Sequence, residues 1–149
     1  MVSGPDNKMS TDIVTTSRRS GAHCWAEAQL FEILGQWLHE FDDNDAVVFA
    51  GERCTLHGLH LQAWRSRIAS SPGIDAEAMV APLSDDDAAR YESLRNNNNG
   101  APNRIAHYER VNAHLVAQYR EHLASVDPLV DEPTHRLLVR MLGQSAAGR

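Results

Sequence analysis

The feature that most constrains this 149-residue chain is the recurrence of apolar side chains at offsets of three and four. This spacing places them on one face of an α-helix, which is buried against another element. A first helix is predicted from Gly21 to about residues 42–44. A second follows from Asn44 or Asp45, either of which can act as the cap, and stops at residues 70–73, Ser-Ser-Pro-Gly. The two stripes are Trp25, Leu30, Phe31, Leu34, Trp37, Leu38 and Phe41, then Val47, Ala50, Cys54, His57, Leu61, Trp64 and Ile68.

The second half of the chain predicts two more helices. One runs from about Pro102 to Val126, with the inner stripe Ile105, Tyr108, Asn112, Leu115, Tyr119, His122 and Val126. The other begins at residues 131–134, with proline in its first turn, and ends at Gly143. Between them lie a short helix around residues 84–94 and an asparagine-rich loop.

No strand-like alternation of apolar and polar residues competes with this helical pattern. The prediction is therefore an all-α protein, an antiparallel four-helix bundle of ferritin-like type. Residues 1–19 are polar and without periodicity, which predicts a disordered N-terminal tail before a single domain over residues 20–149.

The composition of the chain argues against several classes of binding partner. A formal net charge of −6 argues against a nucleic-acid-binding surface. No stretch reaches the roughly 18 apolar residues of a membrane span, and no apolar signal-peptide core precedes the first helix, so we expect no membrane partner and a cytoplasmic location. The two cysteines lack the spacing of a zinc site.

Candidate site residues are the polar side chains that interrupt the apolar stripes, because only these can face the core of a bundle. Glu27 lies on the buried face of the first helix, and His57 and His60 lie one turn apart on the second. Side chains three residues apart have Cβ atoms roughly 5–6 Å apart, within reach of one metal ion. Tyr108, Tyr119 and His122 would lie opposite, on the third long helix, together with Asn112.

Each of these residues also has a structural interpretation. Buried histidines can satisfy the core by hydrogen bonding to a carboxylate or a tyrosine, and Glu27 can be such a hydrogen-bonded carboxylate. The sequence Glu132-Pro133-Thr134-His135 matches Glu-x-x-His, but the proline places Glu132 at the helix start, where a capping role is expected instead.

Three segments resemble ferritin-like helical-bundle proteins, in particular an uncharacterised bacterial group. They are Trp25-Ala26-Glu27-Ala28-Gln29-Leu30-Phe31-Glu32, His57-Gly58-Leu59-His60 with the following Ala63-Trp64-Arg65, and Tyr119-Arg120-Glu121-His122-Leu123 leading to Asp131-Glu132-Pro133-Thr134. Together they span most of residues 21–142. Ferritin-like di-iron enzymes carry a glutamate on each of two helices and Glu-x-x-His on each of two others. By this comparison, the chain has an incomplete set of di-iron ligands.

The resemblance implies a small bacterial enzyme acting on a small organic molecule. Glu27, His57 and His60 would bind iron or manganese or, without a metal, act as acid and base, with Tyr108, Tyr119 and His122 completing the catalytic set. The alternatives are a non-catalytic bundle that binds a ligand or partner after losing the metal site, and a dimerisation module. A short last helix would expose apolar surface, which predicts a homodimer.

Overall fold

The computed structural model describes residues 5–69 and 72–147, with side chains from residue 13 to residue 145. Over these residues the chain is helical and contains no strand, which confirms the all-α prediction. The helices, in chain order, are α1 (Pro5–Glu40), α2 (Asn44–Ala69), α3 (Ala76–Met79), α4 (Asp85–Arg95), α5 (Ala101–Ser125) and α6 (Glu132–Ala147).

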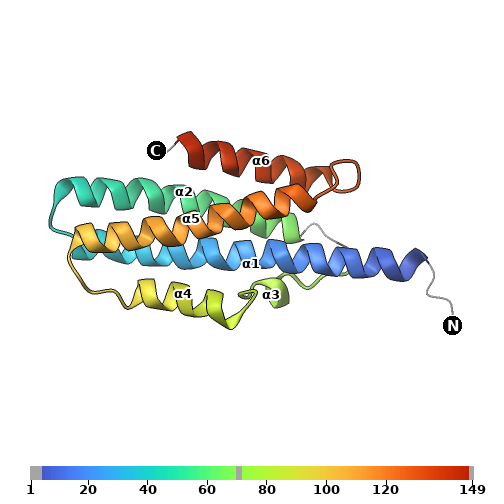
Figure 1. The fold of residues 1–149 in the computed structure, drawn as a ribbon, viewed down its shortest axis with the longest axis horizontal. Helices are drawn as coiled ribbons and strands as arrows, with labels where there is room; N and C mark the ends of the chain where they lie inside the picture. The colour runs from blue at the N-terminus through green and yellow to red at the C-terminus, as the bar shows by residue number, and fades with distance from the viewer. Residues whose placement is uncertain (1–4, 70–71, 148–149) are drawn as a thin grey trace.

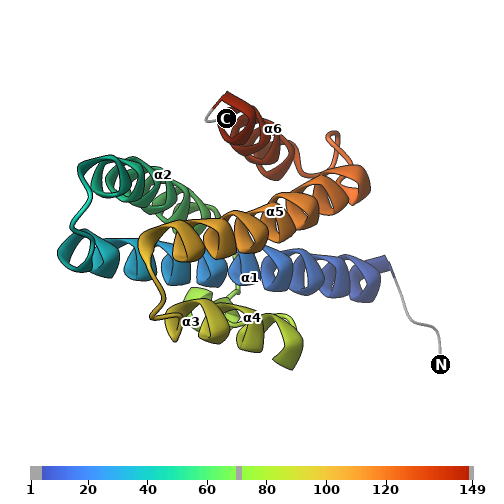
Figure 2. The same cartoon turned by 60° about the vertical axis from the view of Figure 1, so that its left-hand side comes forward.

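Four long helices surround the core (Figure 1). Helices α1 and α2 form an antiparallel hairpin with the most extensive contacts in the molecule. Helix α5 lies along this hairpin, and α6 packs on α5 and α2. The short helices α3 and α4 lie on the other side of α1 from α6, as both views show (Figure 2). The interior between α1, α2, α5 and α6 is therefore enclosed by side chains from distant parts of the sequence.

Side-chain caps explain where several helices begin. The Asp43 carboxylate accepts a hydrogen bond from the Ala46 amide and thereby caps α2, one residue before the cap that the sequence predicted. Ser84 caps α4 in the same way, and Asp131 caps α6 through the Thr134 amide. Asp131 also pairs with Arg67 at 2.9 Å, which ties the start of α6 to the end of α2. These bonds fix the position of each helix along the axes of its neighbours.

Two predicted helix limits are wrong. Helix α1 begins at Pro5, so residues 5–19, which we expected to be a disordered tail, are helical, while residues 1–4 lie outside the described part. Ser17 and Ser20 are buried on this extension, and packing of their face offsets the modest helix propensity of serine and threonine. Helix α6 continues through Gly143 to Ala147, because the roughly 1 kcal/mol cost of a helical glycine is outweighed when the helix packs on its neighbours.

Helix α3 was not predicted from the sequence, and its contact with α1 depends on one glycine. A Cβ atom on Gly21 would lie 1.9 Å from the Met79 carbonyl oxygen, so only glycine allows this approach. None of the described helices is sufficiently long and apolar to span a bilayer.

Candidate functional site

The Glu27 side chain of α1 is the centre of a buried polar cluster. Only 1% of Glu27 is exposed, and both of its carboxylate oxygens accept hydrogen bonds from other helices. Oε2 lies 2.5 Å from the Nδ1 atom of His57, and Oε1 accepts the Tyr119 hydroxyl at 2.5 Å and lies 3.2 Å from the Nδ1 atom of His60. The stripe pattern of the sequence thus correctly places Glu27, His57 and His60 on facing surfaces.

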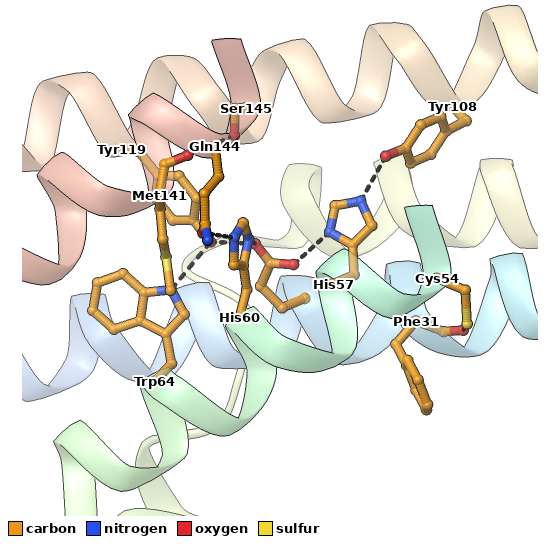
Figure 3. Close-up of polar contacts among 11 residues, drawn as sticks. Phe31, Cys54, His57, His60, Trp64, Tyr108, Tyr119, Met141, Gln144 and Ser145 are labelled. Atoms are coloured by element: carbon orange, nitrogen blue, oxygen red, sulfur yellow. Dashed lines mark hydrogen bonds and ion pairs between the residues drawn. The ribbon is translucent and has the colours of Figure 1, made fainter. Parts of the chain in front are cut away.

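His57 connects Glu27 to α5. Its Nε2 atom lies 2.6 Å from the Tyr108 hydroxyl, so the two ring nitrogens of His57 bridge a carboxylate and a phenol (Figure 3). Both His57 and Tyr108 are buried, and their rings meet edge to face. A hydrogen-bonded series therefore leads from Tyr108 through His57 to Glu27.

His60 makes the corresponding connection to α6. Its Nε2 atom lies 2.9 Å from Gln144 Oε1 (Figure 3), and its Nδ1 atom lies 3.2 Å from Glu27 Oε1. A carboxylate and an amide oxygen can only accept hydrogen bonds, so both ring nitrogens of His60 carry protons in this arrangement. This arrangement therefore favours the protonated form of His60 beside the Glu27 carboxylate.

Electrostatics agree with this assignment. Burial by itself would raise the pKa of Glu27, but the charge and hydrogen bond of His57, followed by those of His60, lower it to about 2. For His60, burial would lower the pKa, but the hydrogen bond and charge of Glu27 raise it above its ordinary value. The carboxylate therefore stays ionised at all physiological pH values and favours the protonated form of His60.

Tyr119 and Trp64 complete the cluster on the side of α5 and α2. The Trp64 indole N–H donates to the Tyr119 oxygen at 3.1 Å, and the Tyr119 hydroxyl in turn donates to Glu27. Burial and the neighbouring Glu27 charge raise the pKa of Tyr119 well above its ordinary value. Tyr119 is therefore a fixed donor to the carboxylate at neutral pH.

The cluster has the composition of a metal site. Glu27, His57 and His60 each offer one ligand atom, and these atoms lie within 4.8 Å of one another. No other group of three such side chains comes together in this way in the described part of the chain. Two imidazoles and one carboxylate suit iron or manganese.

His122, predicted to face this site, instead pairs with a residue that the sequence analysis did not select. His23 Nε2 and His122 Nδ1 are 2.9 Å apart, and both side chains are buried. The pair touches the cluster through rings, since His23 packs edge to face on Tyr119 and His122 stacks on Trp64. The position of His23, four residues before Glu27, was the available signal.

The sequence analysis did not select two further residues, one in the site and one elsewhere in the core. Gln144 was excluded because the last helix was expected to end at Gly143, although Gln144 continues the stripe of Leu137 and Met141. Tyr91 on α4 belongs to the same buried core as Tyr108 and Tyr119. The segment Glu132-Pro133-Thr134-His135 stays outside the site, as expected, because Glu132 is exposed and pairs with Arg136.

A groove of about 650 Å³ reaches the outer end of this hydrogen-bonded series. Tyr108 lines it, as does Ser145, which follows Gln144 on α6. The other lining residues are Phe49, Glu52, Arg53, Glu109, Asn112, Ala113, Val116 and Arg120. Its volume is in the range of small-molecule sites, which are commonly about 300–1,000 Å³.

Comparison with known proteins adds no further assignment, since no family model, curated protein or solved structure matches this chain.

Proposed function

We propose that this chain is a metal-dependent enzyme in which Glu27, His57 and His60 bind one divalent iron or manganese ion. The four long helices would then form a ferritin-like antiparallel bundle with a single metal in its interior. The observation that carries this proposal is that three buried side chains, Glu27, His57 and His60, offer ligand atoms that lie within 4.8 Å of one another. Two histidines and one carboxylate with open positions are the ligand set of mononuclear non-haem iron sites.

The orientation of the two histidines supports a metal at this place. Each directs Nδ1 toward Glu27 and has Nε2 held by an oxygen atom, that of Tyr108 or of Gln144. Metal-binding histidines usually have their second nitrogen hydrogen-bonded, because this bond fixes the ring and its tautomer. If both Nε2 atoms keep their protons, the Nδ1 lone pairs are available for a cation that replaces the Nδ1 protons.

The substrate of this enzyme would be a small organic molecule bound in the groove beside Tyr108. When bound, the metal would supply Lewis-acid or redox chemistry. Tyr119 donates a hydrogen bond to Glu27 and so holds the carboxylate in one orientation. Tyr108 contacts both the groove and His57, and it would transmit a proton between a bound molecule and the cluster.

Metal analysis of the purified full chain tests the proposal. After incubation with Fe²⁺ or Mn²⁺ under anaerobic conditions and removal of free metal, we expect about one ion per chain, with release of protons from the histidines on binding. Glu27→Gln and His57→Ala should abolish stoichiometric binding. His114→Ala is the matched control, because His114 pairs with Asp87 on a different surface. A wild-type chain that retains no metal would overturn the proposal.

A metal-free acid–base enzyme is the second candidate. It is favoured by the continuous series from Tyr108 through His57 and Glu27 to Tyr119, whose hydrogen bonds of 2.5–2.6 Å are all short. Under this hypothesis, the purified chain would contain no metal, and small molecules that bind in the groove would still shift the NMR signals of the His57 imidazole.

The homodimer stays a prediction. Its premise was a short last helix, and this premise no longer holds, because α6 extends to Ala147.

A further inference from the structure

The groove beside Tyr108 is lined by charges of both signs, but only a positive one is shielded from water. Two acidic and two basic side chains line it, those of Glu52, Glu109, Arg53 and Arg120. Three of these four are exposed, and only Arg53, on α2, is half-buried. Water and salt screen exposed charges strongly and partly buried charges much less. Arg53 therefore has the largest influence on which charge a ligand of the groove carries.

Arg53 and Tyr108 pack on the same aromatic ring. The Arg53 guanidinium lies over the ring of Phe49, with its carbon 5.4 Å from the ring centroid. The Phe49 ring in turn meets the Tyr108 ring edge to face, with centroids 5.9 Å apart. All three side chains line the groove. A guanidinium and a phenol are therefore gathered around one ring on the surface that a ligand contacts.

The two arginines of the groove lie at different distances from the Glu27 cluster. Arg53 precedes His57 by four residues on α2, which is about 6 Å along the helix axis at 1.5 Å per residue. Arg120 follows Tyr108 by twelve residues on α5, which is roughly 18 Å along that axis. A small molecule held by Arg53 therefore lies next to Tyr108 and His57, whereas one held by Arg120 does not.

The guanidinium group indicates the chemical class of the ligand. Its planar fork of five N–H donors matches the two oxygens of a carboxylate, and this number of donors lets it bind a ligand while it keeps contacts within the chain. Hydrogen bonds between two charged groups are about twice as strong as those between neutral ones. Burial raises the pKa of the Tyr108 hydroxyl, and the charge of Arg53 opposes this rise, which agrees with their proximity.

We propose that the groove selects small organic carboxylates and that Arg53 binds their carboxylate group. This inference rests on the proposed function of the groove as the substrate site, and it names the substrate class. The apolar part of such a molecule would contact the apolar lining residues Phe49, Ala113 and Val116. The carboxylate end would lie beside Tyr108, where the hydrogen-bonded series to Glu27 begins.

Three probes of similar shape and different charge test the proposal on the full chain at pH 7. Benzoate carries a carboxylate, benzamide a neutral amide and benzylamine an ammonium group. The protein is treated with a chelator, so that benzoate cannot bind through a metal ion. We expect benzoate to bind about tenfold more tightly than either of the others, equivalent to ~1.4 kcal/mol, and to shift the NMR signals of the Phe49 and Tyr108 rings. Equal or tighter binding of benzamide or benzylamine, or no saturable binding of benzoate, would overturn the inference.

Substitution of Arg53 tests which group binds the carboxylate. Arg53→Gln should weaken benzoate binding about tenfold, to the affinity of benzamide, because it removes both the charge and the fork of donors. Arg110→Gln is the matched control and should bind benzoate as the wild type does, because Arg110 is exposed on α5 and does not line the groove. Unchanged benzoate affinity in Arg53→Gln, or a larger loss in Arg120→Gln, would contradict the assignment.

A conservative variant keeps the test decisive if Arg53→Gln does not fold. Arg53→Lys retains the positive charge but not the planar fork, so we expect a smaller loss of benzoate affinity with the preference over benzylamine kept. An affinity equal to that of the wild type would show that no guanidinium contact is made.

The titrations are independent of metal analysis. A wild type that retains no metal but binds benzoate through Arg53 would overturn the metal function and leave the carboxylate site standing. A wild type that binds one metal ion and shows no preference for benzoate would overturn the carboxylate site alone.

Discussion

This protein contains two buried histidine pairs, and their hydrogen-bond partners differ. His57 and His60 share the Glu27 carboxylate, whereas His23 and His122 hydrogen-bond to each other. All four side chains are at most 3% exposed, so burial does not distinguish them. The difference is that one pair has a carboxylate directly bonded to it.

The pKa shifts follow from this difference. Burial lowers the pKa of His122 to about 4, assisted by the charge of Arg19, and lowers that of His23 well below its ordinary value. The hydrogen bond to Glu27 reverses the same burial effect for His60, whose pKa is raised. His23 and His122 are thus neutral at pH 7, whereas Glu27 favours the protonated form of His60, whose proton a metal ion can replace.

Removing the carboxylate should have the largest effect. We expect Glu27→Ala to lower the free energy of unfolding by about 3–5 kcal/mol, because it leaves His57, His60 and Tyr119 without their buried partner. Urea denaturation at pH 7 measures this loss. Glu121→Ala, at an exposed position, is the control and should change stability by no more than about 0.5 kcal/mol. A loss below about 1 kcal/mol for Glu27→Ala would show that the two pairs do not differ in this way.

The neutral pair should make stability depend on pH in a defined direction. Because the folded pKa of His122 lies below the unfolded value of 6.5, the unfolded chain binds more protons as pH falls. The contribution is fully present above pH 6.5 and is lost between pH 6.5 and about 4, amounting to roughly 3 kcal/mol at 1.36 kcal/mol per pKa unit. His23 acts in the same direction.

Proton NMR titration of the His122 ring measures its pKa directly, and denaturation from pH 7 to pH 4.5 measures the coupled loss of stability. A His122 pKa near 6.5 would mean that the pair is not held neutral by burial.

The two tyrosines that contact the cluster should differ in effect. Tyr119→Phe removes the donor to Glu27 and also the acceptor of the Trp64 indole, so we expect a loss of about 2–3 kcal/mol. Tyr108→Phe removes one bond, to His57, and should cost about 1 kcal/mol. Urea denaturation of both variants gives the order, and a larger effect for Tyr108→Phe would contradict the assignment of Tyr119 to the carboxylate.

Gln144→Ala should have the smallest effect on stability, about 0.5 kcal/mol or less, because Gln144 lies on an exposed part of α6. Metal affinity should nevertheless fall about 10–100-fold, because Gln144 orients His60 through its second nitrogen. Competition with a chelator measures the affinity. Gln118→Ala is the control, since Gln118 bonds Asp87 and not the cluster. Equal affinities for the two variants would remove Gln144 from the site.

The sequence by itself determined the helical class and most of the limits of α2, α4 and α5. It also determined that Glu27, His57 and His60 face one interior, because offsets of three and four are dictated by the 3.6-residue turn of a helix. These are properties of a single helix and need no knowledge of its neighbours.

Only the tertiary structure decided which polar groups meet. His23 pairs with His122, 99 residues away, and Gln144 reaches His60 because α6 continues past a glycine that would end an isolated helix. Tyr91 reaches the core from a short helix whose own sequence gives no sign of a site. Such contacts depend on the rotation of each helix about its axis and on its position along the neighbouring helices. Packing and the caps at Asp43 and Asp131 fix both. Periodicity within one helix specifies its buried face, and packing between helices specifies the partners of that face.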